Sequence, residues 1–373
     1  MPPHFQPKLI IMSVGQVFPD RYQQQLQHKT DEVLQQIQQC RLNFPPPKVF
    51  QSNPSHYRMR AEFRVWHEEN DSYYIMFDPV SKDKVRIDEF LVGSERINEL
   101  MTALREQFLH DECLRRKLYQ VEFLTTTTGQ ALVTLIYHKA LDQQWTERAT
   151  QLSSQLGIKI IGRSRKQKII LSENWVEEEF HVAGRHYRYL QVENTFTQPN
   201  AGICETMLNW ACTQAQQCHG DLLELYCGNG NFTLPLAGHF EQVLATEISK
   251  SSIKTATENA HRNNIGNIAF YKASSEEFSR AWLQNDARMA GKMNLADYEL
   301  KTLFVDPPRA GLDSNTIALA RHFESILYIS CNPVSLLDNI ADLSDIFTVQ
   351  SFALFDQFPY THHMECGVFL VRN

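Results

Sequence analysis

Four short stretches of this 373-residue chain carry residue types that could perform chemistry together, and the first is a glycine turn. Residues 222–232 read Leu-Leu-Glu-Leu-Tyr-Cys-Gly-Asn-Gly-Asn-Phe, so an apolar run leads directly into Gly228 and Gly230. Glycines at such a turn let the backbone approach a ligand that a Cβ would exclude, although a purely structural turn has the same composition.

An acidic residue and the absence of a third glycine indicate which class of ligand this turn could bind. Glu247 ends the next apolar run, seventeen residues beyond Gly230, where an acid can accept both ribose hydroxyls of an adenosine cofactor. A site for a dinucleotide would want a third glycine at position 233, where this chain has Thr233. The combination favours an adenosine without a pyrophosphate, such as S-adenosylmethionine.

Two further stretches each place one reactive side chain directly after an apolar run. In the first, Asp306-Pro307-Pro308 follows residues 301–305, which holds one acid rigidly at the carboxyl end of a predicted strand. In the second, Cys331 lies between residues 325–330 and a helix opened by Pro333, where the field of the helix N-terminus can lower its pKa. The alternatives are a solvated aspartate and a buried, unreactive thiol.

The fourth stretch, residues 358–366, reads Phe-Pro-Tyr-Thr-His-His-Met-Glu-Cys and leads into a last apolar run. Glu365 taken alone would be interpreted as a loop acid. His362 and His363 are adjacent and therefore do not form a metal-binding pair on one helix face. The eight cysteines include no Cys-x-x-Cys pair, so we expect neither a zinc site nor a disulfide framework.

Taken in this order, these motifs resemble those of the RNA uracil-C5 methyltransferases. The matching stretches are the glycine turn, Asp-Pro-Pro-Arg-Ala-Gly at 306–311, Ser-Cys-Asn-Pro at 330–333 and His-His-Met-Glu at 362–365. Upstream, Phe196-Thr197-Gln198-Pro199-Asn200 matches the family's Phe-x-Gln-x-Asn element. The resemblance is strong over roughly the last 180 residues and extends more weakly through the middle of the chain.

The resemblance implies a covalent mechanism, because uracil C5 is a poor nucleophile by itself. By the family's pattern, the thiolate of Cys331 adds to C6, C5 takes the methyl group, and Glu365 accepts the C5 proton before the thiolate is eliminated. A stacked base must be flipped out to reach such a site. The positions that correspond to the family's cofactor-binding residues are Gln198, Tyr226, Asn231, Glu247 and Asp306, of which Asp306 could also touch the base.

The chain resembles the branch of the family that acts on tRNA and tmRNA, because it lacks two features of the ribosomal branch. Members of the ribosomal branch are longer and carry an N-terminal barrel and a cysteine-ligated iron–sulfur cluster. Residues 1–190 contain only Cys40 and Cys113, so we expect S-adenosylmethionine without any metal or iron–sulfur cluster. The resemblance thus implies formation of 5-methyluridine at position 54 in the T-loop of tRNA, with tmRNA as a second substrate. The alternative substrate is 23S rRNA.

Basic residues in the middle of the chain are the candidates for holding the RNA. Three alternate along a predicted strand and would share one face, and the others belong to a basic stretch at 159–168 with no acid between Glu147 and Glu173. Such side chains contact phosphates, although a solvated basic face is the alternative for each. The six candidates are Arg58, Arg60, Arg64, Arg163, Arg165 and Lys166. Phe108, Phe123 and Tyr137 could stack on bases, but core packing is the favoured interpretation of these three.

The predicted elements define the fold that must position these residues. Residues 18–40 are typical of a Gln-rich amphipathic helix stopped by Pro45-Pro46-Pro47, and 53–190 alternates strands with helices at about 95–111 and 142–156. From about 205 the chain alternates helix and strand, which predicts an α/β, Rossmann-like, mostly parallel sheet. We therefore expect an N-terminal helical segment (1–52) packed on the catalytic domain, an antiparallel β-rich RNA-binding domain (53–190) and a methyltransferase domain (191–373).

The distribution of charged and apolar residues indicates which partners and which location to expect. A formal charge of −7 argues against a generic nucleic-acid binder, yet residues 1–190 carry 25 basic and 23 acidic side chains while 191–373 carry 11 and 20. The acid excess lies entirely in the predicted cofactor-binding half. No secretory signal is visible in Met1–Met12 and no apolar run of membrane-spanning length exists. We expect a cytoplasmic protein with reduced thiols and with no membrane or protein partner.

Two rival functions remain open from the residues themselves. An amino-group methyltransferase can also carry Asp-Pro-Pro, but it commonly has an aromatic residue after the prolines, where this chain has Arg309, and it has no use for Cys331. An RNA-folding or RNA-binding protein with secondary methylation activity is the rival from a different class.

Overall fold

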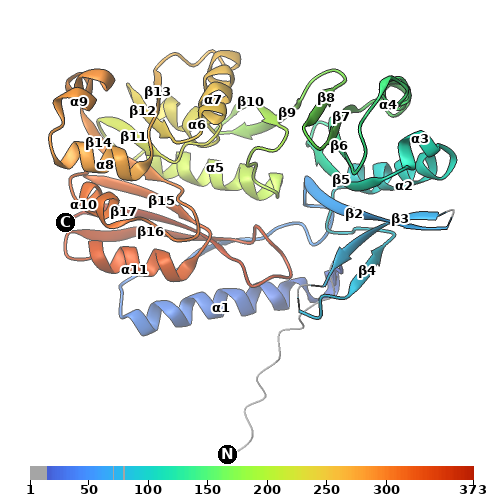
Figure 1. Cartoon of the computed structure of the whole chain (residues 1–373). Coiled ribbons are helices and arrows are strands. Elements are labelled where there is room, and N and C mark those ends of the chain that lie inside the picture. The colour runs from blue at the N-terminus through green and yellow to red at the C-terminus, as the bar shows by residue number, and fades with distance from the viewer. Residues whose placement is uncertain (1–14, 70, 79) are drawn as a thin grey trace, which may run out of the picture. The chain divides into compact units, whose positions relative to one another are not determined.

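The structure is a computed structural model that describes residues 15–69, 71–78 and 80–373 (Figure 1). The described chain forms two compact units. The first contains residues 15–22, Pro54–Thr125 and Ala131–Asn174, and the second contains Gln23–Asn53, Thr126–Gln130 and Trp175–Asn373. The prediction that Met1–Met12 hold no secretory signal lies outside the described residues.

The first unit is a seven-stranded sheet with helices packed against one face. The strand order is β4-β3-β2-β5-β6-β7-β8, and every neighbouring pair is antiparallel except β6 and β7. The strands are β2 (Arg60–Glu68), β3 (Asp71–Phe77), β4 (Lys84–Ile87), β5 (Leu118–Thr125), β6 (Ala131–Tyr137), β7 (Lys159–Ser164) and β8 (Gln167–Ile170). The helices are η1 (Pro19–Arg21), α2 (Glu95–His110), α3 (Glu112–Arg115) and α4 (Gln143–Leu156).

Alternating apolar side chains explain why this sheet buries only one face against the helices. In β2, Ala61, Phe63 and Val65 belong to the core, while the residues between them are more exposed. The helices begin at side-chain caps, since Ser94 accepts the N–H of Ile97 at the start of α2. The three aromatic residues singled out from the sequence, Phe108, Phe123 and Tyr137, are buried in this core, which confirms the packing interpretation.

The second unit contains an eight-stranded sheet of order β1-β16-β17-β15-β14-β11-β12-β13 and a separate β9–β10 hairpin. The strands are β1 (Lys48–Phe50), β9 (Trp175–Val182), β10 (Arg185–Val192), β11 (Asp221–Leu225), β12 (Val243–Glu247), β13 (Ile268–Lys272), β14 (Leu300–Val305), β15 (Ser325–Ser330), β16 (Phe347–Phe355) and β17 (Glu365–Arg372). The helices are α1 (Tyr22–Cys40), α5 (Ala201–Ala215), α6 (Thr233–Leu236), η2 (Ala237–His239), α7 (Lys250–Arg262), α8 (Ser275–Leu283), α9 (Ala287–Met293), η3 (Leu295–Asp297), α10 (Ser314–Ala320) and α11 (Pro333–Leu343).

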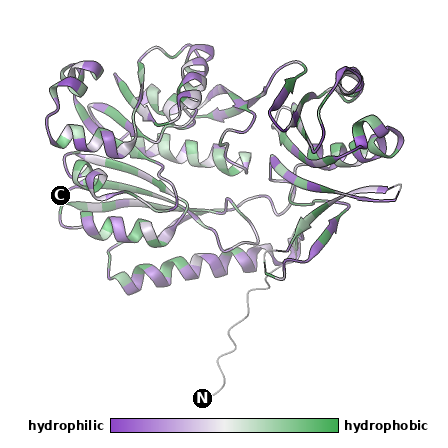
Figure 2. Cartoon of the chain, viewed as in Figure 1, coloured by the Kyte–Doolittle hydropathy of each residue, from purple (hydrophilic) through white to green (hydrophobic). Residues whose placement is uncertain are grey.

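The topology of this sheet confirms the predicted fold class. All neighbouring strands run parallel except β17, which is antiparallel to both β15 and β16. The chain winds outward from β11 to β12 and β13, then returns to place β14 on the other side of β11. In such doubly wound sheets, ligands bind beyond the carboxyl ends of the strands where this reversal occurs. Figure 2 shows the strands of this sheet as mostly hydrophobic and α1 as mostly hydrophilic.

The N-terminal segment belongs to the second unit through both a helix and a strand. Leu26, Val33 and Ile37 of α1 are buried, and β1 pairs in parallel with β16 at the edge of the sheet. The helix ends at Cys40, before the predicted proline stop, because Arg41 adopts a left-handed conformation with φ of 56°. The β9–β10 hairpin, placed by the predicted boundaries in the middle domain, contacts α5 and α7 of this unit.

Candidate active site

Strand register brings Asp306, Cys331 and Glu365 to one edge of the eight-stranded sheet. Asp306 follows the last residue of β14, and Cys331 follows the last residue of the parallel neighbour β15. Ser330 pairs with Cys366 across the antiparallel β15–β17 ladder, so the next position places Cys331 beside Glu365. Three segments that are separate in the sequence therefore deliver a thiol and two carboxyl groups to the same place.

Hydrogen bonds around the nucleophile candidate fix the turn that carries it. Asn332 caps α11 by accepting the N–H of Val334 at 3.2 Å, and its own N–H is donated to the hydroxyl of Ser330 at 3.2 Å. The Asn332 amide also donates to the carbonyl of Arg309 at 3.0 Å. The Asp-Pro-Pro-Arg loop and the Cys331 turn are thus held together as one structural element.

Burial at this edge raises the pKa values of both carboxyl groups. Burial raises the pKa of Asp306 to about 7. Burial, with a smaller contribution from Asp306, raises the pKa of Glu365 to about 8. Groups of this kind, displaced towards neutral pH at a sheet edge, are typical of sites that transfer protons.

The expectation that the helix N-terminus lowers the pKa of Cys331 is wrong for the free protein. Burial, followed by the negative charges of Glu365 and Asp306, raises the pKa of this thiol to about 11. A hydrogen bond from the backbone N–H and the charge of Arg309 lower the pKa, but both are outweighed. Cys331 is consequently a protonated thiol at neutral pH until these charges change.

This shift predicts how Cys331 reacts with iodoacetamide. Since the thiolate is the reactive form, the alkylation rate should rise about tenfold per pH unit from pH 7 towards 10 and level off near the thiol's pKa. Glu365→Gln removes a negative neighbour and should speed the reaction at pH 9. Peptide mass spectrometry measures the rate, with the exposed Cys40 as internal reference. A rate that levels off below pH 8.5 would contradict the assigned environment.

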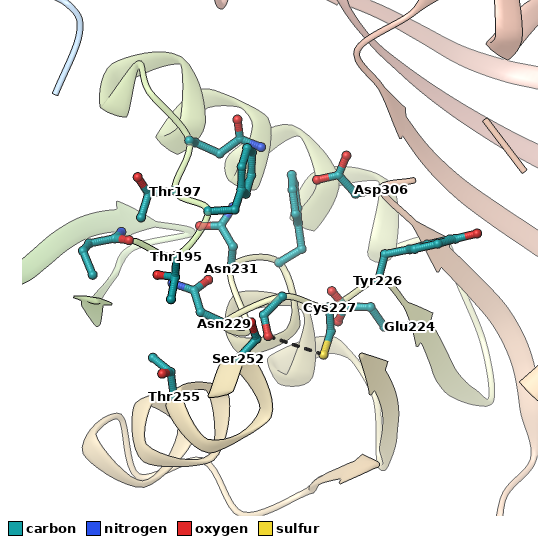
Figure 3. Close-up of a pocket in the computed structure, with 15 residues that line it drawn as sticks. Thr195, Thr197, Glu224, Tyr226, Cys227, Asn229, Asn231, Ser252, Thr255 and Asp306 are labelled. Carbon is teal, nitrogen blue, oxygen red and sulfur yellow. Dashed lines mark hydrogen bonds between the residues drawn. The ribbon is translucent and has the colours of Figure 1, made fainter. Parts of the chain in front are cut away.

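A pocket beside this edge collects four of the five predicted cofactor residues. Gln198, Tyr226, Asn231 and Asp306 line it together with backbone and side chains of the glycine turn and of α7. Figure 3 shows Tyr226, Glu224 and Asp306 on one side of the pocket and Thr195 and Thr197 opposite. The full lining is Gln191, Thr195, Phe196, Thr197, Gln198, Glu224, Tyr226, Cys227, Gly228, Asn229, Asn231, Phe232, Ser252, Thr255 and Asp306.

Glu247, the fifth predicted cofactor residue, lies next to this pocket and not in its lining. Its carboxylate accepts the N–H of Gly228 at 3.2 Å and the N–H of Ser249 at 2.8 Å. Both bonds fix the acid at the carboxyl end of β12, one strand away from the glycine turn. Its oxygens keep further lone pairs for hydroxyl donors, as binding of a ribose requires.

The backbone of the glycine turn fits a ligand that lies against it. Tyr226, Gly228 and Gly230 all have left-handed φ values, of 64°, 56° and 85°. A Cβ on Gly228 would meet nothing within 4 Å, whereas a Cβ on Gly230 would lie 2.6 Å from Leu234. Gly228 therefore leaves open space at the pocket, while Gly230 is needed for packing.

The two glycines predict different effects of alanine. Gly228→Ala should fold, at a cost of about 1–2 kcal/mol for the left-handed conformation, but its methyl group should weaken binding of S-adenosylhomocysteine. Gly230→Ala adds a clash to the same backbone cost and should lower the free energy of unfolding by roughly another 1–3 kcal/mol, with a correspondingly lower melting temperature. Thermal unfolding and calorimetric titration of both variants provide the measurement. Equal losses of stability in the two variants would contradict this distinction.

Sequence reasoning passed over Glu224, although it lies inside the quoted glycine stretch. Glu224 is buried in β11, and burial raises its pKa to about 8, with a further contribution from Asp306. Within the described residues, its Oε2 atom is buried without a hydrogen-bond partner. Such an acceptor next to Asp306 fits a cofactor that carries cationic ammonium and sulfonium groups, as S-adenosylmethionine does.

A second pocket opens on the other side of Cys331 and is lined in part by α1. Arg309, His362 and His363 line it together with Lys29, which is buried and forms an ion pair with Asp356. Nothing in the sequence pattern of α1 pointed to Lys29. Its partner lies 327 residues further along the chain, so only the folded structure reveals the pair.

The predicted RNA contacts all lie in the first unit, and its sheet register connects several of them. Arg64, Gln120, Ile136, Arg163 and Lys168 are successive cross-strand neighbours, so they share the face opposite the helices. Arg60 lies on the same face of β2, while Arg165 and Lys166 form the turn between β7 and β8.

Arg58 does not share a strand with Arg60 and Arg64, as the sequence pattern suggested. It precedes β2 and forms an isolated bridge with Gly93. Its guanidinium donates to the carbonyl of Arg60 at 2.8 Å, and burial lowers its pKa. The predicted alternation was right for β2, but it also took in Arg58, which lies two residues before the strand begins at Arg60.

The described part of the chain lacks two features, a cluster of metal ligands and a membrane-spanning helix. No group of three or more His, Cys, Asp or Glu side chains there is arranged to hold a metal ion. None of the helices there is both long and apolar enough to cross a membrane.

Comparisons with known proteins give the class of the fold. The chain superposes on the crystal structure of Pyrococcus abyssi tRNA (uracil-54, C5)-methyltransferase in complex with S-adenosyl-L-homocysteine with a TM-score of 0.72. The two are 20% identical, and the match covers 94% of this chain and 83% of that one. The comparison gives the fold class, since this chain shares the fold of that methyltransferase structure.

The family follows from the sequence comparisons. Residues 21–373 match the family model of the tRNA (uracil-5-)-methyltransferases. The chain is 52% identical over 355 residues to a tRNA/tmRNA (uracil-C(5))-methyltransferase of Cellvibrio japonicus, covering 94% of this chain and 96% of that protein. It is 49% identical to the protein of the same name from Shewanella amazonensis, covering 97% and 100%. The chain belongs to the tRNA (uracil-5-)-methyltransferase family, which confirms the resemblance inferred from the motifs.

Proposed function

We propose that this protein transfers the methyl group of S-adenosylmethionine to C5 of the uridine at position 54 in the T-loop of tRNA, and to the equivalent uridine of tmRNA. The observation that carries the proposal is the convergence of Cys331, Glu365 and Asp306 at one sheet edge, beside the pocket of the glycine turn. The names of the relatives at about 50% identity support the two RNA substrates.

In the proposed reaction, Cys331 is the nucleophile. The thiol of Cys331 gives its proton to the nearby carboxylate of Asp306, the sulfur forms a bond to C6 of the flipped uracil, and the electron pair of the C5–C6 double bond moves towards C5 and O4. The bound cofactor supplies the methyl group that C5 takes. Glu365 then removes the proton from C5, the C5–C6 double bond forms again and the bond from sulfur to C6 breaks, which releases 5-methyluridine and the thiolate.

The protonation states of the carboxyl groups and of Cys331 depend on whether the cofactor is bound. In the free protein, burial and then the nearby carboxyl groups of Glu365 and Asp306 raise the pKa of Cys331 and keep its thiol protonated. Holding a cationic cofactor next to Asp306 and Glu224 stabilises their carboxylates, which can then take part in proton transfer. Gln198, Tyr226, Asn231 and Glu247 would hold the cofactor, and Asp306, which lines the same pocket at the sheet edge that carries Cys331, would contact it as well.

The RNA is proposed to bind the face of the first unit that carries Arg60, Arg64 and Arg163, with Arg165 and Lys166 on the adjoining turn. Arg64 lies 4.0 Å from the centroid of the Tyr119 ring, and Tyr119 stacks on His138 with centroids 4.0 Å apart. Phosphate-binding arginines beside stacked aromatic rings are suited to an RNA loop with unstacked bases. The buried guanidinium of Arg58 would position this strand rather than reach a phosphate.

The substrate is tested by labelling. The protein is incubated with labelled S-adenosylmethionine and a mixture of unmodified tRNA, tmRNA and rRNA, followed by nucleoside mapping of each RNA. We expect 5-methyluridine in the T-loop of tRNA and in tmRNA. Label that appears only in 23S rRNA would overturn the substrate assignment.

Since all eight cysteines are free, we also propose a reducing, cytoplasmic location.

A further inference from the structure

Two buried polar residues, Asp356 and Gln357, lie between the end of β16 and the segment that leads to Glu365. Both side chains are fully buried, with exposed fractions of 0%. Polar groups so completely removed from water require specific partners, because each unpaired one is costly. The partners of these two side chains lie in different segments of the second unit.

Asp356 fixes the position of this dipeptide from the side of the N-terminal segment. Its carboxylate accepts a hydrogen bond from Gln25 at 2.8 Å and forms the buried ion pair with Lys29. Its backbone N–H donates to the carbonyl of Phe50 in β1 at 3.0 Å. Lys29 additionally donates to the carbonyl of Phe358 at 3.1 Å, so residues on both sides of Gln357 are held in place.

Gln357 faces the loop that carries the cofactor-pocket residue Gln198. Its Nε2 donates to Oε1 of Gln198 at 2.7 Å, and its backbone carbonyl accepts from the Asn200 amide at 3.4 Å. Asn200 itself is buried, caps α5 through the N–H of Ile203 and donates to Ser52 at 2.7 Å. The loop before α5 is therefore attached to Gln357 by two hydrogen bonds, one of which engages the side chain that lines the cofactor pocket.

We propose that Gln357 is a positioning residue for the cofactor, acting through Gln198. Because the amide N–H of Gln357 occupies Oε1 of Gln198, the Nε2 group of Gln198 is the part left to the pocket. Gln198 thus presents a hydrogen-bond donor to an acceptor on the bound cofactor, and Gln357 makes that orientation the favoured one. The inference rests on the proposed function only in taking the pocket ligand to be S-adenosylmethionine or its product.

The other polar atom of Gln357 supports a dedicated role. Within the described residues, its Oε1 is buried and has no hydrogen-bond partner. A leucine or methionine could fill the same volume without burying an unpaired carbonyl, so packing alone does not account for a glutamine here. The donor group that reaches Gln198 is what a glutamine adds at this position.

A double-mutant cycle tests the inference with S-adenosylhomocysteine as the probe. Gln357→Met keeps the approximate volume and removes the donor, and it should weaken binding about tenfold, in keeping with the loss of one oriented hydrogen bond. Gln198→Ala should weaken binding by a similar factor. If Gln357 acts through Gln198, the double variant binds no more weakly than Gln198→Ala alone. Losses that multiply in the double variant would overturn the inference.

A second variant tests the direction of the hydrogen bond. Gln357→Glu can only accept once its carboxyl is ionised, which burial shifts to alkaline pH, so at about pH 10 Gln198 would have to turn its Nε2 away from the pocket, and binding should then weaken at least as much as in Gln357→Met. Wild-type affinity of Gln357→Glu at this alkaline pH, where the wild type still binds, would overturn the assigned orientation. Gln214→Met, a change of another buried glutamine in α5, is the matched control and should leave binding unchanged.

These measurements are separable from folding and from the overall activity. Thermal unfolding of each variant reports any loss of stability, and titration against the folded protein reports affinity. A wild-type chain that binds S-adenosylhomocysteine but methylates no RNA would contradict the proposed function, whereas the cycle would still report whether Gln357 acts through Gln198.

Discussion

Replacing Cys331 by alanine is expected to abolish methylation, with a loss in kcat/KM on the order of 10⁴-fold or more, because the covalent route has no substitute nucleophile. The side chain lies just after β15 and beside Glu365. The substitution leaves the buried residues of β15 unchanged, so we expect the fold to be retained. S-adenosylhomocysteine should bind the variant as it binds the wild type, since Cys331 does not line the cofactor pocket.

The covalent step itself can be observed with RNA that carries 5-fluorouridine at the target. After methyl transfer the fluorine cannot leave as a proton does, so the wild-type protein should remain attached to the RNA and migrate as a complex in a denaturing gel. Cys331→Ala should give no complex, while Cys40→Ala, a change of an exposed cysteine in α1, should give as much as the wild type. A stable complex in Cys331→Ala would remove this residue as the nucleophile.

Glu365→Gln is expected to lower kcat by about 10²–10⁴-fold, the usual effect of removing a general base, while adduct formation continues. Glutamine preserves the shape of the side chain but cannot take the C5 proton. The methylated adduct should therefore accumulate on ordinary uridine-containing RNA, which the wild-type protein releases. The change also removes a negative neighbour of Cys331, which favours its thiolate.

The matched control for this prediction is Glu224→Gln. Glu224 is the other fully buried glutamate near Asp306, and burial raises its pKa to about 8 as it does for Glu365. Since Glu224 lines the cofactor pocket, its change should raise the KM for S-adenosylmethionine without trapping an adduct. Normal turnover in Glu365→Gln, measured by single-turnover methylation and gel analysis, would exclude Glu365 from proton removal.

Much of the second unit could be predicted because its strands are short apolar runs separated by helices. The apolar run at 325–330 matches β15, and the helix predicted to begin at Pro333 is α11. Cys331 and Glu365 could be placed at strand ends from such runs alone. Their position beside each other depends on β17 running antiparallel between β15 and β16, a pairing that no local pattern specifies.

The features missed from the sequence depend on partners far apart in the chain. The ion pair of Lys29 with Asp356 and the hydrogen bond of Gln357 to Gln198 join residues separated by 327 and 159 positions. The pKa of Cys331 was misjudged because its sequence neighbours place it at a helix N-terminus, whereas its pKa is raised by burial in the fold and then by Glu365 of β17 and by Asp306 after β14. The β9–β10 hairpin was missed because its many charged residues weaken the apolar alternation.

Release of the C5 hydrogen tests the central claim most directly, because methyl transfer to C5 by way of a Cys331 adduct must replace that hydrogen. Unmodified tRNA that carries 5-tritiated uridine is incubated with S-adenosylmethionine bearing a ¹⁴C methyl group, and tritium in water and ¹⁴C in RNA are counted together. The account predicts one tritium released for each methyl group incorporated, and neither event with Cys331→Ala. Methyl incorporation without tritium release would contradict it, since the methyl group would then be attached to an atom other than C5.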